Sequence, residues 1–208
     1  MRTINRNLPP VCLAAQPANQ DWFTFMGSQC HADLNNSLRG EQQGLCCYCE
    51  LEVADADGHI EHMEPRCKNS ARTYDYTNLA VSCNGGAVEH CGRYKDNRHK
   101  NPKHVWDGVR FKPPHQATTA ALFKFLQDGS INATAVDVTK ATYLIGYLGL
   151  DCPRLTERRK QHARDLIDTL GEQPDPNILA WLCQDYLQPD ANGRLKQFHS
   201  LSKAILEP

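Results

Sequence analysis

The stretch of sequence that decides the fold reads Cys46-Cys47-Tyr48-Cys49-Glu50. Cys46 and Cys49 have the two-residue spacing typical of a zinc turn, and a second pair, Cys83 and Cys91, flanks a Gly-Gly turn further along. Two thiolates from each of two turns make the closed tetrahedral shell of a structural zinc site. The sequence therefore predicts one structural Zn2+, bound by Cys46, Cys49, Cys83 and Cys91, with Cys47 as a spectator.

The composition is that of an ordinary globular protein of 208 residues with a formal net charge of -1. Residues 1–15 have no continuous apolar run, which argues against a signal peptide, and no stretch approaches the roughly 20 apolar residues that span a bilayer. We therefore expect a soluble, cytoplasmic protein in which clustered cysteines bind metal and disulfides are rare. The other cysteines are expected to be small buried apolar residues: Cys12, Cys30, Cys67, Cys152 and Cys183.

Basic residues are concentrated between positions 66 and 112. This segment has ten lysines and arginines against four acidic residues, a local balance of +6 in a chain that is almost neutral. A surface that binds phosphate groups has such a charge, and so has a solvated basic face. Charge alone does not distinguish a phosphate-binding surface from a solvated basic face.

The pattern of apolar residues predicts an α+β fold. Residues 21–38 have the spacing of an amphipathic helix, capped by Asn19 or Asp21. The segment 46–65 alternates around an Asp-Ala-Asp-Gly turn, which predicts a hairpin that includes His59-Ile60-Glu61-His62. Further elements are expected as a basic helix within 89–100 that Pro102 stops, a hairpin over 122–133, and helices over 138–150, 155–170 and 176–187.

We divide the chain into three parts: an N-terminal helical segment (1–45), a core stapled by the four-cysteine zinc (46–112) and a mainly helical C-terminal subdomain (113–208). The helices after residue 137 carry no cluster of ligand-type residues. They are therefore expected to pack or to bind a partner.

Glu61 and His62 are the candidate reactive groups, because they lie inside the loop that the zinc would close. A histidine at the end of a strand can deprotonate water near neutral pH. An adjacent carboxylate, with one further oxygen ligand, can hold a Mg2+-like ion that stabilises the leaving oxygen of a phosphodiester. The pattern predicts hydrolysis of a nucleic acid with one catalytic ion.

Four motifs resemble those of the zinc-containing HNH endonucleases: Cys46-x-Tyr48-Cys49-Glu50, Ile60-Glu61-His62-x2-Pro65, Tyr76-x-Asn78-Leu79-x2-Ser82-Cys83 and His90-Cys91-Gly92-x2-Lys95. More narrowly, the chain resembles the PtuB-type HNH proteins of Septu and retron-associated phage-defence systems. The likeness covers about residues 44–170, because it continues through Phe123-x-Phe125, Asp128-Gly129-x-Ile131, Ile145-x2-Leu148-x-Leu150 and Leu155-x2-Arg158.

The resemblance implies a ββα-metal (HNH) core with His62 as general base and Glu61 as first ligand of a catalytic Mg2+ or Mn2+. Asn78 would orient the base or brace the loop, and Lys95 would hold a phosphate. It also implies an antiviral nuclease that cuts DNA in preference to RNA. A PtuA-like ABC-type ATPase would be its partner, docked on the C-terminal helices.

Gly92 departs from the family pattern, in which His or Asn often follows the last zinc cysteine as second ligand of the catalytic ion. Asp96 is favoured as a substitute by helical geometry, His90 is another, and Asn97 fits the family string better, so we take Asn97 as the expected ligand. His59 shares a strand face with Glu61 and is interpreted as a plain exposed histidine rather than a support for that carboxylate.

Because of Gly92, a second interpretation stays open: a zinc-stapled module that binds nucleic acid or protein without cutting it. A zinc-dependent hydrolase is the weakest interpretation, because a shell of four cysteines leaves no open position for water.

Overall fold

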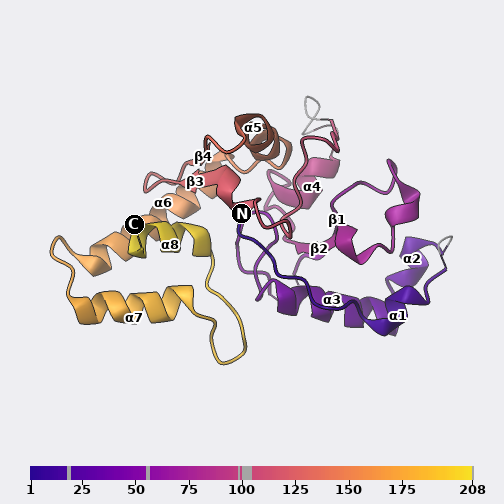
Figure 1. The fold of residues 1–208 in the computed structure, drawn as a ribbon, viewed down its shortest axis with the longest axis horizontal. Helices are drawn as coiled ribbons and strands as arrows, with labels where there is room; N and C mark the ends of the chain where they lie inside the picture. Colours follow the sequence, from indigo (N-terminus) through magenta and orange to yellow (C-terminus); the bar gives the residue numbers. More distant parts are fainter. Residues whose placement is uncertain (18–19, 55–56, 98, 100–104, 208) are drawn as a thin grey trace.

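The computed structural model of the chain describes residues 1–17, 20–54, 57–97, 99 and 105–207. The predicted α+β class is confirmed, with two small antiparallel sheets of two strands each (Figure 1). In chain order the elements are α1 (Val11–Ala14), α2 (Trp22–Phe25), α3 (Gln29–Glu41), β1 (His59–His62), β2 (Leu79–Ser82), α4 (Cys91–Asp96), β3 (Phe123–Phe125), β4 (Ile131–Ala133), α5 (Val138–Tyr147), α6 (Pro153–Leu170), α7 (Pro176–Leu187) and α8 (His199–Leu206), with 3-10 turns at Ser70–Arg72, Tyr76–Asn78 and Ala120–Leu122. In the described part of the chain, no helix has both the length and the apolar character needed to cross a membrane.

The single helix predicted over residues 21–38 is two helices. The Asp21 side chain accepts a hydrogen bond from Thr24 N and caps α2, whereas Ser28 accepts one from His31 N and starts α3 afresh. Each cap satisfies a backbone N–H that a helix start leaves without an intrahelical partner, so two caps favour two starts. The second helix then continues past Gly40 to Glu41, which the prediction had placed beyond its end.

The predicted hairpin within residues 46–65 is wrong in its pairing. Strand β1 pairs with β2, with His59 opposite Ser82 and His62 opposite Leu79. The cysteine turn instead folds back on itself through a hydrogen bond from Cys46 N to Leu51 O, and an isolated bridge pairs the flanking residues Leu45 and Glu52. The partner of β1 therefore lies across the long loop 63–78. Asp55 and Ala56 of the expected turn lie outside the described residues.

Helices cover the first sheet from two sides. In Figure 1, α3 lies below β1 and β2, and α4 lies above them. Leu34 and Leu38 of α3 are fully buried, as is Leu79 of β2, so apolar burial holds α3 to the sheet. The basic helix is shorter than predicted, since α4 ends at Asp96. Pro102, its expected stop, lies outside the described residues.

The second half of the chain follows the prediction more closely. The β3–β4 hairpin and the helices α5, α6 and α7 form where periodicity predicted them, while α8 was not predicted. One apolar core runs through all three predicted parts, from Ile4 and Leu38 through Tyr48 and Val81 to Leu201. The buried Glu50 carboxylate joins these parts as well, since it contacts the Met1 ammonium at 3.0 Å and accepts from Ser200 N at 2.7 Å.

Three of the scattered cysteines were predicted wrongly. Cys12 and Cys30 form a disulfide between α1 and α3, although both were expected as free buried thiols. Cys67 is a free thiol but is exposed, and Cys152 and Cys183 are half-buried. The prediction failed because spacing along the sequence does not report which distant residues meet.

Candidate active site beside a four-cysteine centre

The four predicted cysteines gather into one cluster. The Sγ atoms of Cys46, Cys49, Cys83 and Cys91 all lie within 4.8 Å of one another. The Cys46–Cys91 pair is 3.8 Å apart and the Cys49–Cys83 pair 3.7 Å. A tetrahedral zinc with Zn–S bonds of about 2.3 Å has S···S edges of about 3.8 Å, so this donor set fits a closed zinc site.

Local backbone geometry brings the cysteines together. Cys91 has φ +64° and Glu50, directly after Cys49, has φ +62°. Residues other than glycine adopt this left-handed region only where the surroundings enforce it. At Gly85, with φ +71°, an added Cβ would lie 2.2 Å from His90 O, so only glycine folds the seven intervening residues back. Burial raises the pKa of the Cys47 thiol, which lies outside the cluster, consistent with a spectator.

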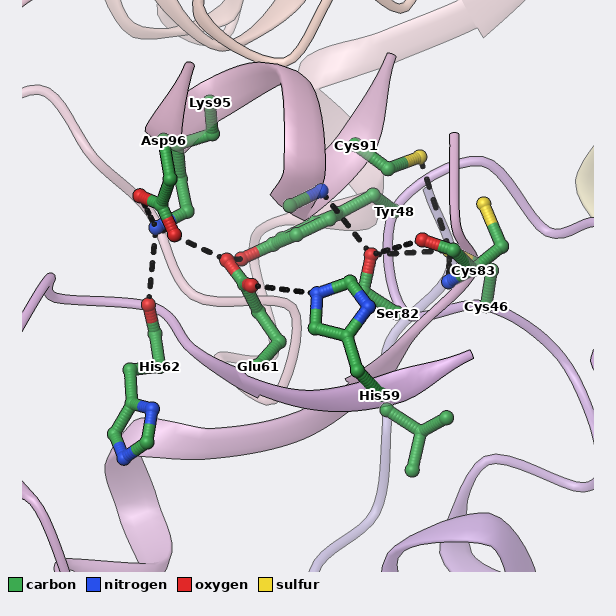
Figure 2. A network of polar contacts seen from close by, with 12 residues as sticks. Cys46, Tyr48, His59, Glu61, His62, Ser82, Cys83, Cys91, Lys95 and Asp96 are labelled. Atoms are coloured by element: carbon green, nitrogen blue, oxygen red, sulfur yellow. Dashed lines mark hydrogen bonds and ion pairs between the residues drawn. The ribbon is translucent and has the colours of Figure 1, made fainter. Parts of the chain in front are cut away.

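Glu61 is the centre of a buried polar network beside this cluster (Figure 2). Its side chain is 2% exposed, and its Oε1 accepts from Tyr48 Oη at 3.1 Å and lies 3.0 Å from Lys95 Nζ. Its Oε2 is 3.3 Å from His59 Nε2. Burial opposes the charged carboxylate, but Lys95 and His59 together outweigh it and lower the pKa of Glu61. The carboxylate is therefore ionised at neutral pH.

Lys95 lies inside the protein rather than at its surface. Its side chain is 0% exposed, and its ammonium contacts Glu61 Oε1 at 3.0 Å, Asp96 Oδ1 at 2.7 Å and His62 O at 3.1 Å. Burial opposes the charge, but the two carboxylates outweigh it and raise the pKa of Lys95. Lys95 was expected to hold a phosphate. It forms an internal ion pair instead, because its ammonium compensates the charge of the buried Glu61 carboxylate.

We expect Lys95→Ala to lower the free energy of unfolding by about 3–5 kcal/mol, because the buried Glu61 carboxylate would lose the ammonium that compensates its charge. Urea denaturation followed by circular dichroism measures this loss. Lys68→Ala is the matched control, since Lys68 is exposed and its loss should change stability by no more than about 0.5 kcal/mol. Equal stability of the two variants would contradict the assignment.

His62 is held by the loop that follows β1. It is 8% exposed, its Nε2 lies 3.0 Å from Thr73 O, and its ring stacks edge-on against Trp22 at 4.4 Å. A carbonyl only accepts, so Nε2 carries the proton in the neutral ring and Nδ1 is the basic nitrogen. Burial lowers the pKa of His62 to about 4, which keeps the imidazole neutral at pH 7.

Asn78 braces this loop. Its Oδ1 accepts from Glu64 N at 2.7 Å, and its Nδ2 donates to Glu64 O at 3.1 Å and to Arg72 O at 3.2 Å. These bonds tie together both ends of the segment that carries Thr73. Of the two roles expected for Asn78, bracing the loop is the one with direct contacts, and it acts on His62 only through Thr73 O.

Of the three candidates for a second ligand, Asp96 lies nearest to Glu61, because both carboxylates contact the Lys95 ammonium. The Asn97 side chain accepts from His99 N at 3.0 Å, which directs it to the residues after α4. His90 Nδ1 lies 3.1 Å from Cys91 Sγ, on the side of the cysteine cluster. Asp96 contacts Lys95. Within the described residues, the four cysteines are the only group of three or more His, Cys, Asp or Glu ligands that gather closely enough to hold a metal.

The glycine at position 92 and the orientation of the His59 side chain are both explained by contact with Glu61. A Cβ added at Gly92 would lie 2.2 Å from Glu61 Oε2 and 2.9 Å from His59 Nε2, so the carboxylate packs on bare helix backbone. The His59 side chain is only 22% exposed and faces Glu61. The interpretation of His59 as a plain exposed histidine is therefore wrong.

These side chains line one cavity of about 1720 Å³. Glu61 and His62 point to opposite faces of β1, as neighbours in a strand must, but both border this cavity. Besides the ion-paired Lys95, its wall contains four basic residues, Arg39, Arg66, Lys68 and Arg93, and two further acidic residues, Asp57 and Asp96. The cavity is large enough for a nucleotide segment, and its basic rim suits a phosphate backbone.

Sequence reasoning missed several residues that shape the cavity. Tyr48 and Thr73 contact Glu61 and His62 through pairings that no local pattern reveals, and Trp22 was recognised only as a helix residue. His59 had a usable signal, because it is two residues before Glu61 and so shares its face of the strand. No protein-family model and no curated protein matches the chain, so its function is inferred from these side chains.

Proposed function

We propose that the chain is an HNH-type endonuclease that hydrolyses phosphodiester bonds in nucleic acid, DNA in preference to RNA. The observation that carries the proposal is the meeting of a neutral, oriented His62 and an ionised Glu61 in one basic cavity. The order of strand, braced loop, strand and helix from β1 to α4 supports the ββα-metal arrangement that the sequence motifs resemble. The four-cysteine cluster supports a structural zinc at its edge.

His62 Nδ1 would take a proton from a water molecule, and the resulting hydroxide would attack the phosphorus atom. The bond to the leaving oxygen then breaks, and that oxygen takes a proton from solvent. The Nε2–H bond to Thr73 O stabilises the positive charge that the imidazole gains during attack. Glu61 would hold the divalent ion, which would supply positive charge to stabilise the leaving oxygen.

The remaining residues position this pair. Lys95 keeps Glu61 ionised and joins it to the backbone at His62 O. The cysteines hold the end of β2 to the start of α4, which brings Gly92 against the Glu61 carboxylate. Each of these contacts limits the motion of a reacting group, and positioning of this kind contributes to rate.

The proposal extends to a cytoplasmic role in bacterial antiphage defence with a PtuA-like ABC-type ATPase partner. It rests on the sequence resemblance. Exposed apolar side chains on α7, Ile178 and Trp181, support a contact surface on the C-terminal helices, since Trp181 is 57% exposed.

A module that binds nucleic acid without cutting it is the second candidate. It is favoured by the contacts of Glu61, because both carboxylate oxygens already face a neighbour, His59 on one side and Lys95 on the other. Incubation of the purified chain with plasmid DNA and total RNA, with and without Mn2+ or Mg2+ and a candidate ATPase, separates the two functions. Strand cleavage supports the nuclease, and binding without cleavage supports the module.

Nucleic-acid affinity should fall steeply with salt, and the triple replacement of Arg66, Lys68 and Arg93 by alanine should reduce the slope of log K against log [salt] by about 2–3. The reason is that each lost cation releases one fewer counterion. Fluorescence anisotropy with a labelled oligonucleotide measures the slope, and Lys124→Ala, an exposed position on β3, is the control. An unchanged slope in the triple variant would show that the cavity rim does not bind the backbone.

A further inference from the structure

Glu61 and His59 meet over the only residue of α4 without a side chain. The two side chains share one face of β1, with Glu61 Oε2 and His59 Nε2 3.3 Å apart. Both groups pack directly against the helix backbone at position 92, because an added Cβ there would lie 2.2 Å from Oε2 and 2.9 Å from Nε2 and would clash with both. Gly92 is itself fixed, since its N–H donates to Ser82 Oγ at 3.1 Å.

The separation of the two atoms suits a shared ion. Two ligands bound at about 2.1 Å and roughly a right angle to each other lie about 3.0 Å apart. His59 Nδ1 is buried and has no hydrogen-bond partner among the described residues. The ring therefore has one polar contact, and that contact is with the Glu61 carboxylate.

We propose that His59 Nε2 and Glu61 Oε2 are two ligands of one divalent transition-metal ion, with His59 supplying from β1 the ligand that Gly92 does not supply from α4. This deepens the proposed nuclease function and rests on it for its biological meaning. An imidazole nitrogen paired with a carboxylate suits Mn2+, Co2+ or Zn2+, whereas Mg2+ takes oxygen ligands and retains its waters. The chain should therefore bind Mn2+ more tightly than Mg2+.

The charges around the pair permit such an ion. The Lys95 ammonium occupies the other oxygen of Glu61, Oε1, so the ion does not have to displace it. Glu61 and Asp96 carry two negative charges against the one positive charge of Lys95, which leaves one negative charge uncompensated.

Titration of the zinc-loaded 208-residue chain with Mn2+, followed by the electron paramagnetic resonance signal of free Mn2+, tests the proposal without any substrate. We expect one Mn2+ per chain, displaced only by a large excess of Mg2+. His59→Ala should weaken Mn2+ binding at least about tenfold. His99→Ala is the control, because His99 is an exposed histidine that lines the same cavity.

Unchanged Mn2+ affinity in His59→Ala, or no Mn2+ bound by the parent at millimolar concentration, would overturn the assignment and leave His59 and Glu61 as an ion pair. Circular dichroism and zinc content establish that the variant is folded. The two proposals fail separately. A parent that cleaves nucleic acid while His59→Ala binds Mn2+ normally disproves only the ligand role, and a parent that binds Mn2+ through His59 but cuts nothing disproves only the nuclease.

Discussion

Replacement of His62 by alanine should lower the rate of nucleic-acid cleavage at least about a hundredfold, because the proposed mechanism gives the proton of the attacking water to His62 Nδ1. Its Nε2 is committed to Thr73 O, and its ring is fixed against Trp22, so Nδ1 has one orientation. Fold, zinc content and substrate affinity should stay close to those of the parent. Single-turnover cleavage of a labelled duplex under saturating metal measures the loss in the chemical step.

His31→Ala is the matched control for this replacement. His31 also packs edge-on against Trp22, at 6.1 Å, but its ring contacts no loop carbonyl in the part of the chain that the structure describes, so its loss should leave the rate within about threefold. Burial lowers the pKa of His62 to about 4, so the parent should lose activity in acid only below about pH 5 rather than near the usual 6.5. A His62→Ala variant that cleaves at the parental rate would contradict the role of His62 as general base and would favour the binding module.

Replacement of Cys83 by serine should unfold the central part of the chain, rather than lower the cleavage rate of a protein that stays folded. Strands β1 and β2 form only four residue pairs, too few to be stable alone, and zinc bound by four thiolates contributes of the order of 10 kcal/mol in small domains. A weakened shell would free the end of β2 from α4. Thermal unfolding by circular dichroism and zinc analysis by mass spectrometry measure the two consequences.

Cys47→Ser is the control for the zinc prediction, because Cys47 is buried next to Cys46 but lies outside the cluster. It should retain one zinc per chain. Two results would contradict the prediction: a purified parent without zinc, or a Cys83→Ser variant with an unchanged melting curve.

The parts of the fold that sequence predicted are those set by local chemistry. The Asp128-Gly129 turn gave the β3–β4 hairpin, and helical periodicity with Pro176 at the first position gave α7. The pairing of β1 with β2 was missed because it is separated by a loop of 16 residues, and no local pattern specifies such a partner. The break at Ser28 was missed because the apolar spacing continues through it.

The same division applies to the site. Spacing was sufficient to find the four cysteines, because zinc ligands come in short pairs, and the Glu61-His62 dipeptide stood out once those pairs were recognised. The burial of Lys95 was not readable, since a lysine on a short basic helix looks exposed until tertiary packing supplies its carboxylate. The fit of the Glu61 carboxylate over Gly92 could not be predicted either, because it depends on the distance between β1 and α4.

The continuous core limits how this site can be moved between proteins. Cys91 N donates to Leu148 O at 2.7 Å, and Phe198 N donates to Glu50 O at 2.8 Å, so both turns of the cysteine cluster are hydrogen-bonded to the C-terminal half. A graft of residues 46–112 onto another scaffold would carry every ligand and the base but would lose these backbone partners. The transplantable unit is therefore the whole chain, and new specificity has to be engineered by substitution within the cavity.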